Sequence, residues 1–572
     1  MRKLRVPFCI LFLAFGSSFS FGQSWLWARE GINNTNSTVC DPTSIATDDQ
    51  GNVFETGGFV GSITFGNDTI ASIGVPGAIL VKYDSNGNFL WAWNAKDANR
   101  NSVSNALSVT TDNIGNSYIT GSFIDTVIFG AFKLTSKNTD VFLVKFAPNG
   151  NVLWAKTSKE INGGLGCEGF SVTTDRSSNV YIAGQFRDTI SFGSDTVITN
   201  NLNRYYAFLV KYDSNGNALW LKSAQTGVAT AAGINYSITT DSNKNIYLTG
   251  TFFDTASFGP YILTTISPLG SIFLVKYDSN GNVKWAKSGI GANLSYVIYY
   301  NESNSIVTDR VGNIYITGQL LDTITFGSYK LNTNINLQRD IFFVKYDTAG
   351  DIIWAQCGKP PLSGGPGGPG YSLSMDKWNH IYLTGSFQDT ISFGSLKLVS
   401  NAPMPSCIFK FDTSGAALCG TYIDNLNDDA NAIAASPLGS DIYFGGDVGM
   451  GDCIFGNDTL HDGGSSEYLF IAKWQPCNNT ITSVNSVTEK NSIAIFPNPN
   501  NGVFTIQSSV AGGPLSVEVY NVLGKKVLTE ALLSPQGDNV INLSDNPSGV
   551  YLYRVLNKDG GSLGSGKVII DK

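Results

Sequence analysis

The segment SVTTDNIGNSYITGSFIDTVIFG, residues 108–130, recurs along this chain with small changes. It returns as SVTTDRSSNVYIAGQFRDTISFG at residues 171–193 and as SITTDSNKNIYLTGTFFDTASFG at residues 237–259. Each copy is followed by a second phrase, for example FLVKYDSNGNALWLK, which ends at Lys222. The pair of phrases occurs seven times between residues 43 and 475, at a spacing in the low to middle sixties. Self-similarity of this kind indicates a repeat architecture.

Each repeat predicts four β-strands. A first strand like SVTTD turns at an Asp-x-x-Gly-Asn segment into a second strand like VYITGSF. A connection with Asp-Thr and Phe-Gly leads to a third strand like IFLVKY, and Asp-Ser-Asn-Gly-Asn turns the chain into a fourth. Asn-Gly between apolar runs favours a tight hairpin, because both residues tolerate a positive φ. Since only 14% of the residues are charged and 12% are aromatic, the composition also indicates an all-β protein.

The third strand and the ends of the repeat region predict a closed ring. IFLVKY is almost continuously apolar, so both of its faces need cover, which radially packed blades provide. Residues 24–30, SWLWARE, match a fourth strand with nothing before it, whereas the seventh repeat stops after EYLFIAKW at residues 467–474 without a fourth strand. We therefore predict a seven-bladed β-propeller over residues 23–475, in which the N-terminal strand completes the last blade and hides its edge.

The repeats resemble those of secreted bacterial β-propeller proteins. The motifs Gly-Asn-x-Tyr-x-Thr-Gly and Lys-Tyr-Asp-x-x-Gly-Asn carry the resemblance, which covers about four-fifths of the chain. Blades six and seven depart from the pattern: Cys419 stands where Trp154 and Trp220 stand in earlier repeats, and Gly445 and Gly446 replace Thr-Gly. The resemblance implies an architecture and leaves the ligand open.

The N-terminus predicts a signal peptide over residues 1–22. Arg2, Lys3 and Arg5 precede an apolar run that is too short to span a bilayer, and small residues precede an expected cleavage site before Gln23. Loss of these three positive charges would change the formal net charge from −8 to −11. An acidic chain of this kind has no electrostatic case for binding nucleic acid. No later stretch is apolar over the length of a membrane span, so we expect a secreted protein that is not integral to a membrane.

The cysteines predict neither a zinc site nor a disulfide scaffold. Seven remain without Cys9, and they lack CxxC spacing. Cys407 and Cys419 flank one predicted hairpin and are candidates for pairing, although the strand register leaves this open. The odd number predicts at least one free or intermolecular thiol.

A second domain follows the repeats. Residues 476–491 are rich in Thr, Ser and Asn and predict a linker, and residues 492–572 contain about seven short β-runs. Val517, Val519 and Val522 alternate with polar neighbours, which favours a small immunoglobulin-like β-sandwich with one inward face.

This C-terminal domain resembles the type A sorting domain of type IX secretion substrates. Three blocks carry the resemblance, and their key residues are Pro497, Asn498, Pro499 and Gly502; Tyr520, Asn521 and Gly524; and Pro547, Gly549 and Tyr551. The resemblance implies export through the periplasm and outer membrane of a Gram-negative cell by the type IX machinery. It further implies removal of the domain and attachment of the new C-terminus to surface lipopolysaccharide. An ordinary immunoglobulin-like binding module is the alternative, because prolines also end strands for structural reasons.

No catalytic constellation is visible in the sequence. The two histidines, His380 and His461, are not flanked by a nucleophile motif, so we interpret both as loop residues. Asp84, Asn86 and Asn88 place oxygens at alternate positions, as calcium loops do, but no acidic residue follows to give a bidentate ligand. Turn chemistry explains these residues better, so no cofactor is expected and calcium is the alternative. The equivalent segments are Asp213, Asn215 and Asn217, and Asp278, Asn280 and Asn282.

Two further repeated positions are interpreted as scaffold, because an active site generally breaks symmetry. The recurring Asp-Thr aspartates are read as turn or capping groups: Asp125, Asp188, Asp254, Asp322 and Asp389. The recurring tryptophans are read as packing between blades: Trp27, Trp91, Trp154, Trp220, Trp285 and Trp354.

The leading functional hypothesis is a non-catalytic binding or structural protein, secreted or held at the cell surface, whose ligand is a glycan, matrix or another protein. The alternative is a secreted polysaccharide hydrolase or lyase on a propeller scaffold, which would need paired carboxylates or similar groups. Its candidates are polar residues outside the repeat pattern: Glu160, Glu168, Tyr299, Tyr300 and Glu302.

Overall fold

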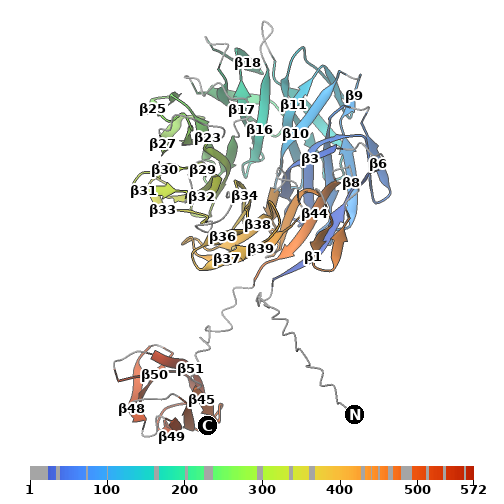
Figure 1. The fold of residues 1–572 in the computed structure, drawn as a ribbon. Helices are drawn as coiled ribbons and strands as arrows, with labels where there is room; N and C mark the ends of the chain where they lie inside the picture. Colours follow the sequence, from blue (N-terminus) through green and yellow to red (C-terminus); the bar gives the residue numbers. More distant parts are fainter. Residues whose placement is uncertain are drawn as a thin grey trace, which may run out of the picture. The chain divides into compact units, whose positions relative to one another are not determined.

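The computed structural model describes most of the chain after the predicted signal peptide. The described residues are 23–572 apart from 34–38, 73–74, 100, 160–165, 200–203, 225–235, 293–299, 334–338, 360–367, 425, 427–431, 440, 449–450, 462–467, 478–492, 510–514, 523, 533–535 and 559–561. The predicted signal peptide at 1–22 and nearly all of the predicted linker at 476–491 lie outside them. Their regular structure consists of β-strands without an α-helix, which confirms the all-β class (Figure 1).

The first compact unit, Met1–Asn478, is built from antiparallel four-stranded sheets, one for each repeat. In chain order they contain β3 (Val39–Thr47), β4 (Val53–Val60), β7 (Gly77–Tyr83) and β8 (Phe89–Asn94); β10 (Val103–Thr111), β11 (Ser117–Ile124), β14 (Asp140–Phe146) and β15 (Val152–Thr157); β16 (Cys167–Thr174), β17 (Val180–Phe186), β20 (Tyr206–Tyr212) and β21 (Ala218–Ser223); β22 (Ser237–Thr240), β23 (Ile246–Phe252), β26 (Ser271–Tyr277) and β27 (Val283–Gly291); β28 (Glu302–Thr308), β29 (Ile314–Leu321), β32 (Arg339–Tyr346) and β33 (Ile352–Cys357); and β34 (Gly370–Met375), β35 (Ile381–Ser386), β38 (Ser406–Phe411) and β39 (Ala417–Ile423).

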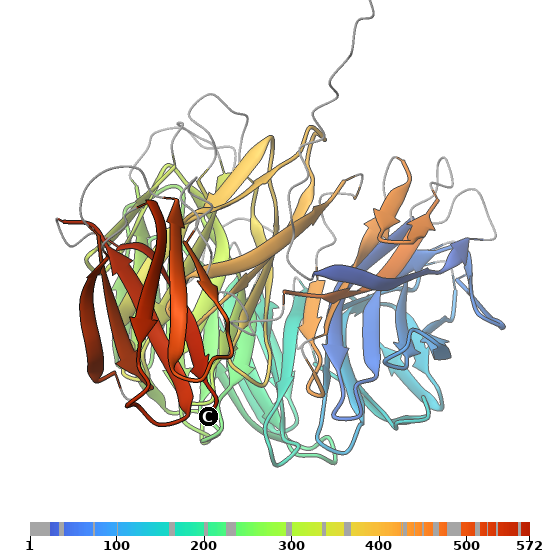
Figure 2. The same cartoon turned by 90° about the horizontal axis from the view of Figure 1, so that it is seen from below.

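The last sheet combines both ends of this unit. It contains β40 (Ala432–Ala435), β41 (Ile442–Val448), β44 (Tyr468–Gln475) and, as its outer strand, β1 (Ser24–Glu30). β1 pairs antiparallel with β44, so that Ala28 lies opposite Ala472. This confirms that the orphan N-terminal strand supplies the missing fourth strand. In Figure 2 the first sheet (blue) and the last (orange) lie next to one another.

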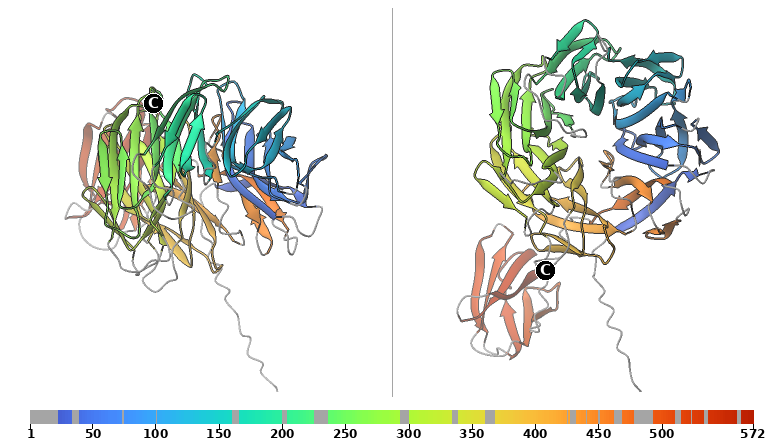
Figure 3. Two further views of the ribbon diagram at one scale, coloured as in Figure 1. Left: turned by 90° about the horizontal axis from the view of Figure 1, so that it is seen from above. Right: turned by 45° about the horizontal axis from the view of Figure 1, so that its top comes forward.

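The sheets follow one another around a common centre in chain order (Figure 3). Their first strands make a closed series of contacts from β3 through β10, β16, β22, β28 and β34 to β40, which contacts β3 again. The third strands are buried along all or nearly all of their length, as their continuous apolar sequence predicts. The propeller-like arrangement therefore brings one strand of every repeat to the centre.

Each connection between second and third strands forms its own small hairpin, which we did not predict. The seven hairpins within the described residues are β5 (Ser62–Phe65) and β6 (Asp68–Ala71); β12 (Thr126–Phe129) and β13 (Phe132–Thr135); β18 (Thr189–Phe192) and β19 (Asp195–Ile198); β24 (Thr255–Phe258) and β25 (Tyr261–Thr264); β30 (Thr323–Phe326) and β31 (Tyr329–Asn332); β36 (Thr390–Phe393) and β37 (Leu396–Val399); and β42 (Cys453–Phe455) and β43 (Asp458–Leu460). Short β2 (Ile32–Asn33) and β9 (Lys96–Asp97) extend two of them. The Phe of each Phe-Gly turn, such as Phe129, is buried and anchors the hairpin.

The repeated polar residues join neighbouring sheets. In the second sheet, Oδ1 of Asp112 accepts the backbone N–H of Asn116 at 2.9 Å, and Oδ2 accepts the Tyr118 hydroxyl at 2.9 Å. Lys145 extends from the third strand past Asp112 and donates to the Ser214 carbonyl of the next sheet at 3.1 Å. These buried polar groups therefore satisfy one another within and across sheets.

The recurring tryptophans pack between sheets, which confirms their interpretation as scaffold. Trp154 Nε1 donates to the same Ser214 carbonyl at 3.3 Å, and its ring lies against Gly216 of that turn. A Cβ on Gly216 would stand 3.0 Å from the ring, and the residue has a φ of +80°. The turn Gly is therefore needed both for its positive φ and for close approach. The ring of Trp27 lies against Gly87, so the same ring-to-glycine contact joins the last sheet to the first.

A disulfide replaces this tryptophan contact between the sixth sheet and the last. Cys419 is bonded to Cys477, so the possible pairing of Cys407 with Cys419 is wrong. The physical reason is the register of the hairpin: Cys407 lies opposite Tyr422, while Cys419 lies opposite Lys410. Lys410 donates to the Cys477 carbonyl at 3.1 Å, as Lys145 donates to Ser214, so Cys477 occupies the place of a turn residue. Five free cysteines are described: Cys40, Cys167, Cys357, Cys407 and Cys453.

The boundary between first and last sheets also holds a buried acid. Glu55 is fully buried where other repeats place Ile119 or Leu248, and neither carboxyl oxygen has a hydrogen-bond partner within the described residues. Burial raises its pKa well above the usual range. Gly445 stands where most other repeats have Thr, and a Cβ there would lie 2.7 Å from Glu55 Oε1. The glycine thus leaves the space that the carboxyl fills.

The second compact unit, Asn479–Lys572, contains two antiparallel sheets that share one core. One sheet contains β45 (Ile493–Phe496), β46 (Val503–Ser509) and β49 (Gln536–Asn542), and the other contains β47 (Leu515–Asn521), β48 (Lys526–Leu532), β50 (Gly549–Leu556) and β51 (Ser562–Ile570). Val517 and Val519 point into the core as predicted, but Val522 is 70% exposed, because it follows the end of β47 in the turn closed by Asn521.

Candidate functional site

The turn aspartates that resemble calcium ligands are occupied by hydrogen bonds. Oδ1 of Asp84 accepts the backbone N–H groups of Asn86 and Asn88, and Oδ2 accepts the Asn88 amide at 2.8 Å. Burial opposes ionisation of Asp84, but these hydrogen bonds outweigh it and lower its pKa. Within the described residues, no three His, Cys, Asp or Glu side chains are grouped to hold a metal ion. The geometry favours the interpretation as turn chemistry.

The Asp-Thr aspartates are turn residues as well. Asp125, Asp188, Asp254, Asp322 and Asp389 have φ values of +59° to +65°, and their backbone carbonyls accept an N–H from across the hairpin. Asp tolerates this left-handed conformation better than most residues. Their repetition therefore follows from hairpin geometry, as interpreted from the sequence.

Neither histidine belongs to a nucleophile arrangement in the described residues. His380 replaces the turn Asn, and its Nδ1 lies 2.8 Å from Oδ2 of Asp376. His461 is 73% exposed in its side chain, and its Nδ1 lies 3.2 Å from Asp452. The loop interpretation holds for both.

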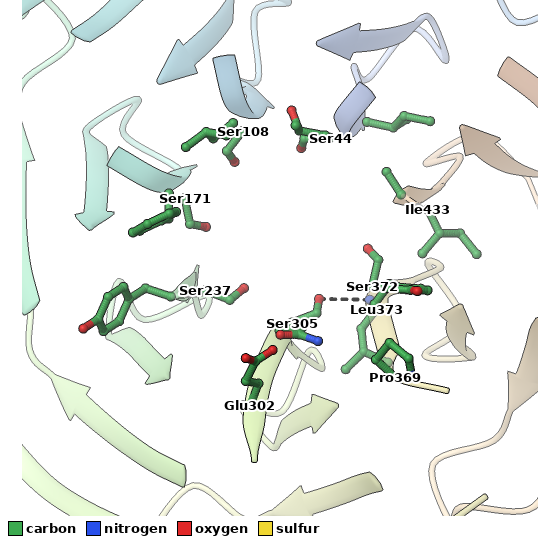
Figure 4. Close-up of a pocket in the computed structure, with 18 of the residues that line it drawn as sticks. Ser44, Ser108, Ser171, Ser237, Glu302, Ser305, Pro369, Ser372, Leu373 and Ile433 are labelled. Carbon is green, nitrogen blue, oxygen red and sulfur yellow. Dashed lines mark hydrogen bonds between the residues drawn. The ribbon is translucent and has the colours of Figure 1, made fainter. Parts of the chain in front are cut away.

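The first strands enclose a cavity of about 650 Å³ at the centre of the first unit (Figure 4). Sites for small ligands usually measure about 300–1,000 Å³, so this volume suits one. The lining residues come from all seven central strands and their approaches, and most of the lining area is polar. This central cavity is the candidate functional site.

A ring of serines forms one level of the central cavity. Ser44, Ser108, Ser171, Ser237, Ser305 and Ser372 occupy the same repeat position, and Ala432 takes the seventh. Four of their hydroxyl oxygens accept a backbone N–H from the next sheet; one is the bond from Leu373 to Ser305 at 2.9 Å, drawn in Figure 4. A hydroxyl that accepts in this way keeps its own proton to donate. The ring therefore joins the sheets and offers hydrogen-bond donors to the cavity.

The residue before each ring serine differs from repeat to repeat. The register shifts at this position in most sheets, for example between Gly169 and Ser171, which marks a β-bulge. The residues placed there that line the cavity are Thr43, Leu107, Phe170, Tyr236, Asn304 and Tyr371. Because bulges re-aim side chains, the scaffold presents a varied set of groups from a repeated backbone feature. Sequence reasoning missed these residues. The signal that could have found them is a single variable position directly before the serine that recurs in the first strand of the repeats.

Among the described residues that line the central cavity, the charged groups lie on one side. Glu302 on β28 and Arg339 on β32 belong to one sheet, with Gln319 on the strand between them. Burial raises the pKa of Glu302 to about 7, although Arg339 opposes this. Of the alternative catalytic candidates, Glu302 thus lines the cavity, whereas Glu168, at the equivalent position of the third sheet, accepts a hydrogen bond from Gln185 at 2.9 Å. The backbone carbonyl of Tyr300 accepts a hydrogen bond from the Gln319 amide, and Glu160 and Tyr299 lie outside the described residues.

The predicted sorting residues gather into structural contacts of the second unit. The Asn498 side chain binds the backbone of β51 at Lys567 and Ile569, at 3.0 and 2.8 Å. Gly502 has a φ of +104°, and a Cβ added to it would lie 2.8 Å from Ser544 Cα. Gly524 has a φ of +76° in the turn closed by Asn521. Tyr551 donates to the Pro547 carbonyl at 2.9 Å. Proline residues 497 and 499 flank Asn498 before β46.

An ion-pair cluster lies on the outer face of the same unit. Glu518 accepts hydrogen bonds from Lys526, Tyr520 and Arg554 at 2.5 to 2.7 Å. These bonds lower the pKa of Glu518 to about 2. Sequence reasoning singled out Tyr520 and missed its three charged neighbours.

The C-terminal unit is a type IX sorting domain. Residues 494–571 match the family described as the secretion system C-terminal sorting domain. This confirms the resemblance stated from the three sequence blocks, and such a tail indicates export from the cell. In the described part of the chain, no helix has the length and apolar character to cross a membrane.

Similarities over the rest of the chain are distant. An uncharacterized WD repeat-containing protein of Acanthamoeba polyphaga mimivirus is 23% identical over 85% of this chain, which spans only 40% of that protein. A protein of unknown function from Dyadobacter fermentans is 9% identical, with a TM-score of 0.33 over 67% of this chain and 99% of its own. PorZ, a surface component of the type IX secretion system of Porphyromonas gingivalis, is 11% identical, with a TM-score of 0.21 over 93% of this chain and 81% of its own. Structural agreement this loose carries no functional conclusion.

Proposed function

We propose that this protein is exported by type IX secretion and acts outside the cell or on its surface as a non-catalytic binding or structural module. In this proposal residues 23–475 form a seven-bladed β-propeller and residues 492–572 an immunoglobulin-like sorting domain. The succession of four-stranded sheets and the two-sheet C-terminal unit support these assignments.

The export route begins with the N-terminal segment. Residues 1–22 act as the signal peptide that brings the chain into the periplasm of a Gram-negative cell, and the sorting domain then engages the type IX machinery. Attachment to surface lipopolysaccharide after processing follows from the same family. A chain without residues 494–572 should accumulate in the periplasm, whereas the full chain should appear outside the cell.

The observation that carries the binding role is the central cavity. It combines a polar serine ring with side chains that vary between repeats at one bulged position. Repetition of the backbone with variation of the side chains is the arrangement expected of a recognition surface rather than of packing alone. The ligand is a glycan, matrix component or protein.

A polysaccharide hydrolase or lyase is the less favoured function. Glycoside hydrolysis generally uses two carboxyl groups across the scissile bond. Glu302 is the one carboxylate among the residues lining the described cavity, and the equivalent Glu168 is held by Gln185.

The test is a glycan-array assay on the purified chain without residues 1–22, run with calcium and then with chelator. Saturable binding to one glycan class supports the binding role. Loss of binding with chelator would support the alternative that the turn aspartates bind calcium. A blank array under both conditions would redirect the search to protein partners, and turnover of a bound polysaccharide that depends on Glu302 would refute the non-catalytic assignment.

A further inference from the structure

Two sheets of the first unit carry the same acid and amide, which allows a direct comparison. Glu168 lies opposite Gln185 in the third sheet, and Glu302 lies opposite Gln319 in the fifth. In the third sheet Gln185 donates to the Glu168 carboxylate at 2.9 Å. In the fifth, Gln319 donates instead to the Tyr300 carbonyl at 2.9 Å. Equivalent backbone positions therefore hold one carboxylate that is engaged and one that its neighbour leaves available.

The available carboxylate faces the central cavity. Figure 4 shows the Glu302 carboxyl group pointing into the space that the serine ring surrounds. Within the described residues no hydrogen bond to this carboxyl group is found, and Arg339 is the charged group that acts on it. Arg339 stands where the third sheet has Tyr205 and the fourth has Gly270, so the pair of opposite charges is unique to this side of the cavity.

Aromatic side chains lie on the neighbouring walls. Tyr371 of the next sheet lines the cavity, and Phe170 and Tyr236 line it from the third and fourth sheets, with ring centroids 5.9 Å apart. The partly exposed rings of Phe170 and Tyr371 offer an apolar face, while a carboxylate accepts and a guanidinium donates several hydrogen bonds in a plane. Sugars present just these two surfaces, a face of C–H groups and an edge of hydroxyl pairs.

The charges and the lining exclude other ligand classes. One Arg compensated by one Glu gives no net attraction for a strongly anionic ligand. A polar majority in the lining disfavours an apolar ligand, since its serines and charged groups would lose water without a partner. The free hydroxyl protons of the serine ring suit ligand oxygens.

We propose that the central cavity binds a neutral oligosaccharide, with Glu302 and Arg339 hydrogen-bonding a hydroxyl pair and Tyr371 packing against the sugar face. This deepens the proposed function and rests on it. Glu302 and Arg339 set the orientation of the sugar, and the bulge residues of the other sheets set which sugars fit.

The experiment measures affinity by isothermal calorimetry, using the chain without residues 1–22 and a glycan chosen from neutral, sulfated and uronate-bearing arms of an array. Glu302→Gln should weaken binding of the neutral glycan about 10- to 100-fold, the usual effect of losing a hydrogen bond to a charged group. Arg339→Gln should act similarly. Glu168→Gln, the matched control in the equivalent position, should leave affinity unchanged.

At one ligand concentration, the midpoint of thermal unfolding should rise by the same amount in the wild-type chain and in Glu168→Gln and by less in Glu302→Gln, which reports binding independently of the calorimeter. Equal binding by wild type and Glu302→Gln would place the site elsewhere while leaving the binding role intact. Binding of sulfated or uronate glycans alone would overturn the ligand class. Absence of binding in all arms would overturn the inference, and a protein ligand captured at another surface would still satisfy the proposed function.

Discussion

The buried acid between the first and last sheets predicts how stability depends on pH. Glu55 is fully buried, both of its carboxyl oxygens lack a hydrogen-bond partner in the described structure, and burial raises its pKa well above the usual range. The folded protein therefore keeps this group protonated at pH values where the unfolded chain has released the proton. Stability is greatest below the pKa of the unfolded group and falls as pH rises toward the folded pKa.

The magnitude follows from proton linkage. One proton bound in the folded state but not in the unfolded state costs about 1.4 kcal/mol of stability for each pH unit. Between pH 5 and pH 7, Glu55 should thus lower the free energy of unfolding by up to about 2.7 kcal/mol. Glu55→Gln keeps the size of the side chain and removes the titration, so the difference between wild type and variant should shrink as pH falls.

The assay is urea unfolding at pH 5, 6, 7 and 8, followed by tryptophan fluorescence. All 10 tryptophans lie at or before Trp474, so the signal reports on the first unit. Other acids contribute equally to both proteins and cancel in the difference. Asp68→Asn, on an exposed hairpin, serves as the control for a changed carboxylate. A difference between wild type and Glu55→Gln that stays constant from pH 5 to pH 8 would refute the account of a neutral buried acid.

Three further predictions address the scaffold and the tail. Cys419→Ser should lower the stability of the first unit by about 2–4 kcal/mol, because the disulfide joins residues 58 apart. Unfolding of the wild-type chain with and without reductant measures the same effect, and Cys357→Ser is the control. Equal stability of the oxidised and the reduced chain would contradict this prediction. Asp112→Ala should cost about 3 kcal/mol or more in thermal unfolding, since it leaves the buried hydroxyl of Tyr118 without its acceptor and the buried ammonium of Lys145 without its opposite charge, whereas Asn113→Ala should be neutral. Asn498→Ala removes two hydrogen bonds to β51 and should reduce the exported fraction in a cell-fractionation assay, and unchanged export would show that the side chain is dispensable for sorting.

The sequence predicts the scaffold well because each repeated residue has one local reason to be there. Asn-Gly turns, continuously apolar third strands and the orphan strand at residues 24–30 are signals that depend only on neighbouring residues and on strand pairing. The small hairpins were missed because Asp-Thr and Phe-Gly were read as a connection, whereas Asp125 at a positive φ and buried Phe129 shape a pair of strands.

The candidate site was only partly predictable, because it depends on residues brought together from different repeats. Glu302 stood out as a residue outside the repeat pattern, but its position near Arg339 in the same cavity requires the register across β29. The contrast between Glu302 and Glu168 cannot be read from the sequence, because each acid lies opposite a glutamine. The two glutamines differ only in their acceptor, which is the Glu168 carboxylate in one sheet and the Tyr300 carbonyl in the other. The partner of Cys419 was missed for a related reason: Cys477 lies beyond the last strand, in a turn position without a following strand.

The Cys419–Cys477 bond bears on the proposed removal of the C-terminal unit. Every described strand and cross-sheet bond of the first unit is made by residues up to Cys477, and the bond lies at the last of them. A protease that cut between this point and the sorting domain would remove the sorting domain and leave these strands and bonds of the first unit intact. β44 would remain paired with β41 and β1, and the new C-terminus would follow the disulfide bond directly rather than the end of an unsecured strand. A force applied through a group attached to that new C-terminus would reach the Cys419–Cys477 bond before it reached the paired strands.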